Sequence, residues 1–114
     1  MLKDHATPAG TAGYANGFTT YGANYRPMLG MSISSVGIGT YLGDEDAATD
    51  STYAEAIRAA VVGGINLVDT AVNYRCQRSE RVIGNVIAEL ASRGQVRREH
   101  IFKGFCRTMP RIYK

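Results

Sequence analysis

The sequence has few of the features that mark secreted, membrane-spanning or metal-stabilised proteins. Its two cysteines, Cys76 and Cys106, lie thirty residues apart and form neither a disulfide framework nor a metal-ligand spacing. The first residues contain no apolar core of a signal peptide, and no apolar run approaches the ~20 residues that span a bilayer. We therefore expect no metal site, no membrane partner and a reducing, cytoplasmic setting.

A strong excess of one charge is also missing. The 114 residues carry 13 basic and 10 acidic side chains, a net charge of +3. Most of the excess comes from Arg75, Arg78, Arg81 and residues 93–98, on and around one predicted helix. A nucleic-acid-binding face is usually denser in basic residues and interleaved with aromatic ones. We interpret these arginines as a solvated helix face and expect no nucleic-acid partner.

What the chain does have is the composition of one globular domain, with 45% hydrophobic and 20% charged residues. Its organising stretch is the short apolar run at residues 65–68, which leads directly into Asp69 and is followed by Tyr74. An apolar run of this length, with glycine before it, is typical of a buried parallel strand. Asp69 would then lie at the carboxyl end of that strand, where α/β folds place their chemistry. By itself, Asp69 could equally be a carboxylate that accepts hydrogen bonds from loop amides.

Residues 1–24 are rich in Gly, Ala, Thr and Tyr and show no helical or strand period. We expect an extended arm, with Tyr14, Phe18 and Tyr21 as possible anchor points. Residues 25–34 predict a hairpin that turns at Gly30. Residues 107–114 show neither period and predict an irregular tail.

Residues 35–43 predict the first core strand and its exit loop. The glycines here do not form a dinucleotide fingerprint, because no helix starts after Gly39. A first helix follows, with Thr49, Asp50 or Ser51 as its N-cap and residues 63–64 at its end.

After the 65–69 strand, a second helix is predicted over residues 79–92. A third strand begins near residue 101. Strand–helix–strand–helix–strand order predicts an α/β fold with parallel strands and right-handed crossovers.

The motif D-T-A-x-x-Y at residues 69–74, with S-E at 79–80 and glycine at 84, resembles the active-site segment of the aldo-keto reductases. V-G-I-G-T at residues 36–40 is similar to that family's first barrel strand, and residues 25–34 to its hairpin. The resemblance implies a partial (β/α)8 TIM barrel over residues 25–106. This part would hold the N-terminal hairpin, about three parallel strands and two helices.

The resemblance also implies NADPH as the cofactor and aldehydes or ketones as substrates. Cofactor contacts would fall on Gly39, Thr40 and Tyr41, together with Asp69. Tyr74 would donate a proton to the carbonyl oxygen as hydride arrives. A nearby lysine, held by Asp69, would lower the phenol pKa.

The identity of that lysine stays open. Lys103 matches if three residues are missing from the third strand, whereas an ungapped count places Cys106 there. We predict Lys103 as the third catalytic residue. Arg75 follows Tyr74 where the family usually has glycine, which would crowd the loop. Glu80 is interpreted as support for a helix start.

A full barrel needs ~250 residues, and no histidine matches the family's catalytic one. We expect an N-terminal fragment of a reductase that is inactive alone and that would act on a small carbonyl substrate if completed. The alternative is a small, non-enzymatic α/β module that associates through exposed sheet edges, with itself or with a partner.

Overall fold

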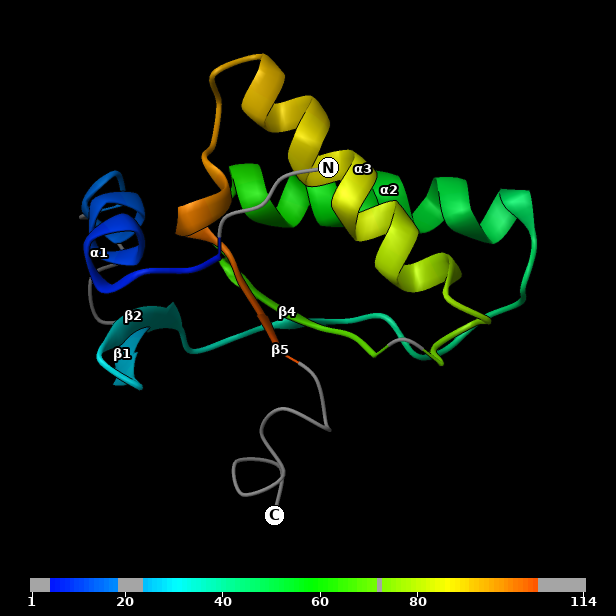
Figure 1. Cartoon of the computed structure of the whole chain (residues 1–114), viewed down its shortest axis with the longest axis horizontal. Coiled ribbons are helices and arrows are strands. Elements are labelled where there is room, and N and C mark those ends of the chain that lie inside the picture. Colours follow the sequence, from blue (N-terminus) through cyan, green and yellow to red (C-terminus); the bar gives the residue numbers. More distant parts are fainter. Residues whose placement is uncertain (1–4, 19–23, 72, 105–114) are drawn as a thin grey trace.

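The computed structural model describes residues 5–18, 24–71 and 73–104. Figure 1 shows two long helices above a group of short strands, with a hairpin and a further helix at one side. In chain order the elements are α1 (Pro8–Asn16), β1 (Tyr25–Met28), β2 (Met31–Ser34), β3 (Ile38–Gly39), α2 (Ala47–Val62), β4 (Leu67–Asp69), α3 (Arg78–Ser92), the 3-10 helix η2 (Arg98–His100) and β5 (Phe102–Gly104).

The strands β3, β4 and β5 form a parallel sheet in that order. This confirms the predicted α/β class and the parallel alternation of strands and helices. The register aligns Gly39 with Asp69 and Asp69 with Gly104, so these three residues form one row across the carboxyl edge of the sheet. Each strand is short, and β4 begins at Leu67, two residues later than the sequence predicts.

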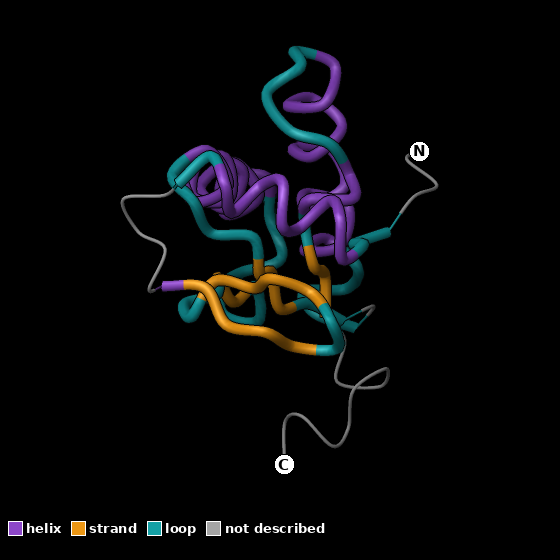
Figure 2. Tube along the Cα trace, turned by 90° about the vertical axis from the view of Figure 1, so that its left-hand side faces the viewer, coloured by secondary structure: helices purple, strands orange, loops and turns teal. Residues whose placement is uncertain are grey.

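Helices α2 and α3 cover one face of this sheet, and the turned view in Figure 2 shows helices gathered on one side of the strands. Apolar residues at helical spacing on both helices meet Val68 of β4 in the main core. The fully buried apolar members are Ile57, Val61, Val68, Ile83, Ile87, Leu90 and Ile101. No helix within the described residues is long and apolar enough to cross a membrane.

Helix α2 begins earlier than its predicted caps. Asp46 is the N-cap, and its carboxylate accepts a hydrogen bond of 2.8 Å from the amide of Thr49. The expectation of Thr49, Asp50 or Ser51 as the N-cap was therefore wrong, because the extended residue with a free side-chain acceptor lies three positions upstream. Asp50 is instead used in contacts with arginines beyond the helix.

The predicted hairpin is confirmed as β1 and β2, which pair antiparallel around a two-residue turn. Leu29 and Gly30 both have positive φ, 53° and 80°, as a two-residue hairpin turn with the favoured twist requires. Ile33 of the hairpin packs on Phe102 of β5 in a second, smaller cluster. That cluster lies on the face of the sheet opposite to Val68, because side chains alternate along a strand.

The prediction of an extended arm was wrong over residues 8–16, which form α1. Thr7 caps this helix by accepting a 2.9 Å hydrogen bond from Gly10, and Pro8 occupies the first helical position. The Thr11 hydroxyl, fully buried, accepts from the amide of Ser32, and the Tyr14 hydroxyl donates to the Val61 carbonyl. These tertiary contacts stabilise α1, whose sequence has no apolar stripe from which a helix could be predicted. Tyr21 and the tail 107–114 lie outside the described residues.

Candidate functional site

The predicted site residues lie at the carboxyl edge of the parallel sheet. Asp69 is the last residue of β4 and is half-buried. Its side chain shares a face with Leu67 and Phe102, because Val68 between them points into the helical core. The Asp69 carbonyl accepts a 2.8 Å hydrogen bond from the Thr40 hydroxyl, which ties the ends of β3 and β4 together.

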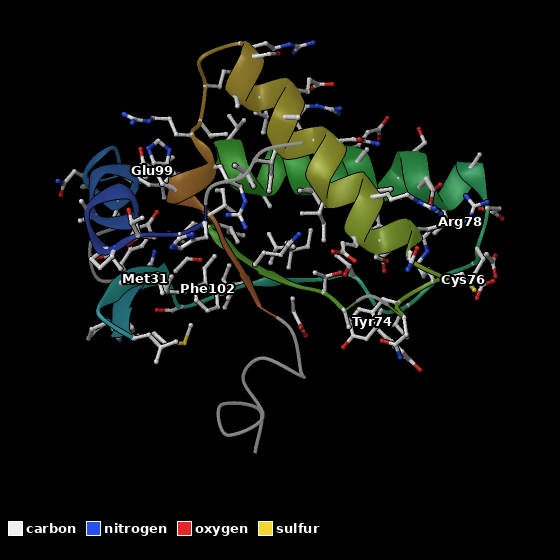
Figure 3. All side chains as sticks on the ribbon, in the orientation of Figure 1. Met31, Tyr74, Cys76, Arg78, Glu99 and Phe102 are labelled. Atoms are coloured by element: carbon white, nitrogen blue, oxygen red, sulfur yellow. The ribbon has the colours of Figure 1, made fainter. Side chains whose placement is uncertain are left out.

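Tyr74 lies in the turn between β4 and α3, on the same side of the molecule as the start of α3 (Figure 3). Its amide donates to the Ala71 carbonyl at 3.1 Å, which folds the chain back directly after the strand. The ring of Tyr74 meets the ring of Tyr41 edge to face, with 5.0 Å between centroids. The structure thus brings together a predicted catalytic residue and a predicted cofactor contact.

Lys103 lies on β5 directly beside Val68, so its side chain shares the helical face of the sheet and not the face of Asp69. Its ammonium is 3.9 Å from a carboxylate oxygen of Glu80, in the first turn of α3. Burial lowers the pKa of Lys103, and the Glu80 carboxylate opposes that shift. Cys106, the other candidate for the lysine position, lies outside the described residues.

Of the four predicted cofactor contacts, the three that follow one another at the end of β3 differ in what they can offer a ligand. Thr40 is 1% exposed, and both of its hydrogen-bonding groups contact the protein: the hydroxyl donates to Asp69 and the carbonyl accepts from Ser79. Gly39 is exposed, and a side chain added there would meet nothing within 4 Å. Tyr41 is 65% exposed and presents its ring at the same edge.

Ser79 explains why the S-E pair follows the strand motif. Its hydroxyl donates a 2.5 Å hydrogen bond to the Thr40 carbonyl, so the first turn of α3 is attached to the end of β3. Glu80, its neighbour, faces Lys103. Within the described residues, no three His, Cys, Asp or Glu side chains come close enough to hold a metal ion.

Arg75 has a larger structural role than the sequence indicated. It is buried, has a φ of +50°, and donates hydrogen bonds to the Asp44 carbonyl at 2.9 Å and to the Asp50 carboxylate at 2.5 Å. The partners lie 25 and 31 positions away in the chain, beyond the reach of local pattern. The signal in the sequence was an arginine where the family that the motif resembles usually has glycine, and the positive φ explains why glycine suits this position.

Comparison with known proteins matches the part of the chain that forms most of the parallel sheet. The model described as "Aldo/keto reductase family" matches residues 35–103, more than half of the chain. Aldo-keto reductase YhdN of Bacillus subtilis (strain 168) is 41% identical over 70 residues, which are 59% of this chain and 21% of the relative. Aldose reductase C of Dictyostelium discoideum is 33% identical over 88 residues, 76% of this chain and 25% of the relative.

Methylglyoxal reductase YeaE of Escherichia coli (strain K12) is 37% identical over 60 residues, 53% of this chain and 21% of the relative. The chain thus spans about a fifth to a quarter of the length of these curated relatives. The matched residues include β3, β4 and the turn that carries Tyr74, as well as α2 and α3. On this match, and on the sheet that it encloses, the chain belongs to the aldo/keto reductase family.

Proposed function

We propose that this chain supplies the N-terminal part of an NADPH-dependent oxidoreductase that reduces aldehydes or ketones. The observation that carries the proposal is the row of strand ends, where Asp69 closes the central strand and Tyr74 follows in the next turn. Two of the similar proteins are named as reductases of carbonyl compounds, aldose and methylglyoxal. Two cysteines without a pairing pattern support a reducing, cytoplasmic setting.

The residues at this edge fit a flat, extended cofactor. Gly39 leaves open space at the end of β3, so a ligand could approach the backbone there. Tyr41 presents an exposed ring beside Tyr74. The Thr40 hydroxyl is already used in a hydrogen bond to the Asp69 carbonyl, which joins the ends of β3 and β4. NADPH, when bound, supplies the hydride that reduces the carbonyl carbon.

In this proposal Tyr74 is the general acid. Its phenolic O–H breaks as the carbonyl oxygen takes the proton, which yields the alcohol. A phenol has an ordinary pKa of about 10 and transfers its proton more readily when a nearby cation stabilises the phenolate. Asp69 orients that cation. Lys103 is the proposed source of this cation. Its side chain lies on the helical face of the sheet near Glu80, so it must leave Glu80 and move to the face that carries Asp69 before it can act.

The described residues form three parallel strands, fewer than a closed barrel requires. We therefore expect the 114-residue chain alone to show no NADPH-dependent reduction of methylglyoxal. The direct test of the proposal is a chimera in which residues 35–103 replace the corresponding segment of the Escherichia coli relative, which is named as a methylglyoxal reductase. We expect the folded chimera to consume NADPH in the presence of methylglyoxal. A folded chimera that binds NADPH without reducing the aldehyde contradicts the proposal.

The second candidate is a non-enzymatic module that associates through a sheet edge. It is favoured by the exposure of apolar side chains around β3, which has no neighbour on its outer side among the described strands. Val36 and Tyr41 are each 65% exposed, and Leu42 is 74% exposed. An exposed edge with apolar flanks is a template for pairing with a second copy.

Light scattering after size-exclusion chromatography distinguishes the module. A discrete folded dimer that Leu42→Lys converts to a monomer supports it, because the lysine charge would be placed in the pairing region. Leu29→Lys is the matched control, since Leu29 is also 65% exposed but lies in the hairpin turn. A wild-type monomer, or a dimer that both variants disrupt equally, excludes pairing through β3.

A further inference from the structure

The turn that carries Tyr74 has an unusual backbone. Arg75, Cys76 and Gln77 are consecutive residues with φ of 50°, 53° and 68°. Residues with a Cβ rarely adopt this left-handed conformation, because the Cβ crowds the carbonyl oxygen. Helix α3 follows at once, and its N-cap, Gln77, makes no side-chain capping bond. Such a turn persists only where surrounding contacts hold it.

The contacts that hold the turn come from Arg75 and from the exposed Cys76 thiol, which hydrogen-bonds Glu45. The Arg75 side chain is 1% exposed and reaches the loop between β3 and α2, residues 40–46, where Nε donates to the Asp44 carbonyl. One terminal nitrogen bonds Asp50 in the first turn of α2, and the guanidinium carbon lies 4.9 Å from the centre of the Tyr53 ring. The hydroxyl of Tyr53 in turn donates to the Leu42 carbonyl.

The electrostatics favour a charged, fixed guanidinium at this place. Burial alone would raise the pKa of Asp50, but hydrogen bonds from Arg75 and Arg78 outweigh it and hold that pKa below its ordinary value. The second terminal nitrogen of Arg75 is buried without a hydrogen-bond partner in the described part of the chain. The Tyr53 ring lies against the guanidinium and provides the compensating cation–π contact.

We propose that Arg75 is a positioning residue that fixes residues 73–77 against the loop 40–46 and thereby sets the ring of Tyr41 against that of Tyr74. The two rings belong to these two segments and meet at 5.0 Å, and the buried guanidinium bonds the loop from the turn at the Asp44 carbonyl, whereas the Cys76 thiol, which also reaches the loop by a hydrogen bond to Glu45, is exposed. The consequence for proton donation by Tyr74 rests on the proposed function. The contact itself does not.

Hydrogen exchange resolved by residue tests this in the 114-residue chain. The amides of Tyr74 and Arg78 report on the turn, because they donate to the Ala71 and Arg75 carbonyls. Thr49 and Asp50, whose amides bond to Asp46, report on the end of the loop. Ile87 in the buried face of α3 is the reference for global opening.

Three variants separate the roles of the arginines. Arg75→Gln removes the positive charge and most of the N–H donors of the guanidinium. Arg75→Lys keeps the positive charge but loses the planar arrangement of donors. Arg78→Gln is the matched control, because Arg78 bonds the other oxygen of the Asp50 carboxylate from a side chain that is 33% exposed. Loss of a charged hydrogen bond corresponds to about a tenfold change in an opening equilibrium.

We expect exchange of the turn and loop amides to rise about tenfold in Arg75→Gln and less in Arg75→Lys, with the Ile87 amide unchanged. The nuclear Overhauser contact between the Tyr41 and Tyr74 rings should disappear in Arg75→Gln and persist in Arg78→Gln.

Unchanged exchange, an equal effect of Arg78→Gln, or a uniform rise at all amides overturns the proposal. If Arg75→Gln does not fold, Arg75→Lys decides by the same criteria. Because neither NADPH nor a carbonyl compound enters the measurement, its failure leaves the proposed reaction untouched.

Discussion

At the scale of single residues, some polar groups at the strand ends hold the fold together, and others are proposed to take part in the reaction. The Thr40 and Ser79 hydroxyls are used in hydrogen bonds to backbone carbonyls, which join β3, β4 and α3. Thr70 is fully buried, and its hydroxyl has no hydrogen-bond partner among the described residues. The groups that we propose for proton transfer, the Asp69 carboxylate and the Tyr74 phenol, lie beside these hydrogen-bonded strand ends.

Two glycines are expected to respond oppositely to alanine. Gly84 is exposed within α3, and a Cβ there would meet nothing within 4 Å. Gly84→Ala should therefore stabilise the fold by about 1 kcal/mol, the difference in helix propensity. At Gly37, a Cβ would lie 2.9 Å from the Leu67 side chain, so Gly37→Ala should destabilise by about 1–3 kcal/mol. Denaturant unfolding monitored by circular dichroism measures both, and a destabilised Gly84→Ala would contradict the described environment.

Histidine 100 should make the stability depend on pH. Its Nδ1 accepts a 3.1 Å hydrogen bond from the Arg97 amide, which requires that nitrogen to be unprotonated, and its ring packs on Tyr14. Burial lowers the pKa of His100, with Glu99 opposing and Arg97 adding to the shift. The unfolded chain therefore binds this proton more readily than the folded one, so stability is full above the ordinary pKa and falls as pH decreases through the folded pKa.

We predict that the free energy of unfolding decreases as the pH falls below about 6.5, the ordinary pKa of histidine, and that His100→Gln flattens this slope. The same substitution at His5, which is exposed, is the control and should leave the slope unchanged. Urea unfolding at a series of pH values measures how the free energy of unfolding depends on pH in each variant. A wild-type slope retained in His100→Gln would assign the dependence to other groups.

At the scale of elements, Asn66 joins three parts of the chain. Its side-chain oxygen accepts from the Ser34 amide at 2.8 Å, and its nitrogen donates to the carbonyls of Ser32 and His100 at 2.9 and 3.2 Å. The residue is fully buried, directly before β4. The side-chain amide of Asn66 thus joins both the hairpin and η2 to the start of the central strand by hydrogen bonds.

Asn66→Ala should destabilise the fold by about 3 kcal/mol, because it leaves several buried polar groups without partners. Asn85→Ala is the matched control on an exposed position of α3 and should change stability by about 0.5 kcal/mol or less. Thermal unfolding of the two variants gives the comparison. Equal melting temperatures would mean that the hairpin is held by apolar packing alone.

The same scale shows how far the sequence could predict the fold. The parallel strands and both long helices follow from local signals: apolar runs bounded by glycine, and apolar stripes such as Ile83, Ile87 and Leu90. Helix α1 could not be predicted in this way, because its stability comes from Thr11 and Tyr14 contacting residues far along the chain. Helix propensity and period carry no information about such contacts.

Some features of the candidate site could also be predicted from the sequence, and others could not. The apolar run predicts Asp69 at a strand end, and the resemblance of the D-T-A-x-x-Y motif to a known family singles out Tyr74; the structure places them at the end of β4 and in the turn beyond it. Their catalytic roles stay a prediction. Arg75 was noted only as a departure, since its function depends on Asp44 and Asp50 in another loop. The sheet register, and with it the helical face of Lys103, also cannot be obtained from sequence, because it depends on how neighbouring strands align.

At the scale of the whole molecule, the described residues form a sheet of three parallel strands with helices on one face and a hairpin packed against the other. Its relatives are four to five times longer than the matched segment. A carbonyl reductase built from this sheet needs further strands to complete the barrel and its cofactor site. Under the proposed function, the described residues contribute Asp69 and Tyr74 to proton transfer, and this role stays a prediction.

The most direct test of that role is the rate of NADPH-dependent methylglyoxal reduction by the chimera carrying residues 35–103, compared between Tyr74→Phe and Tyr41→Phe. Both variants keep the ring and remove one hydroxyl. We predict that Tyr74→Phe lowers kcat by about a hundredfold or more, as loss of a general acid does, while Tyr41→Phe changes it by less than about threefold. Equal rates in the two variants would contradict the role of Tyr74 as the proton donor.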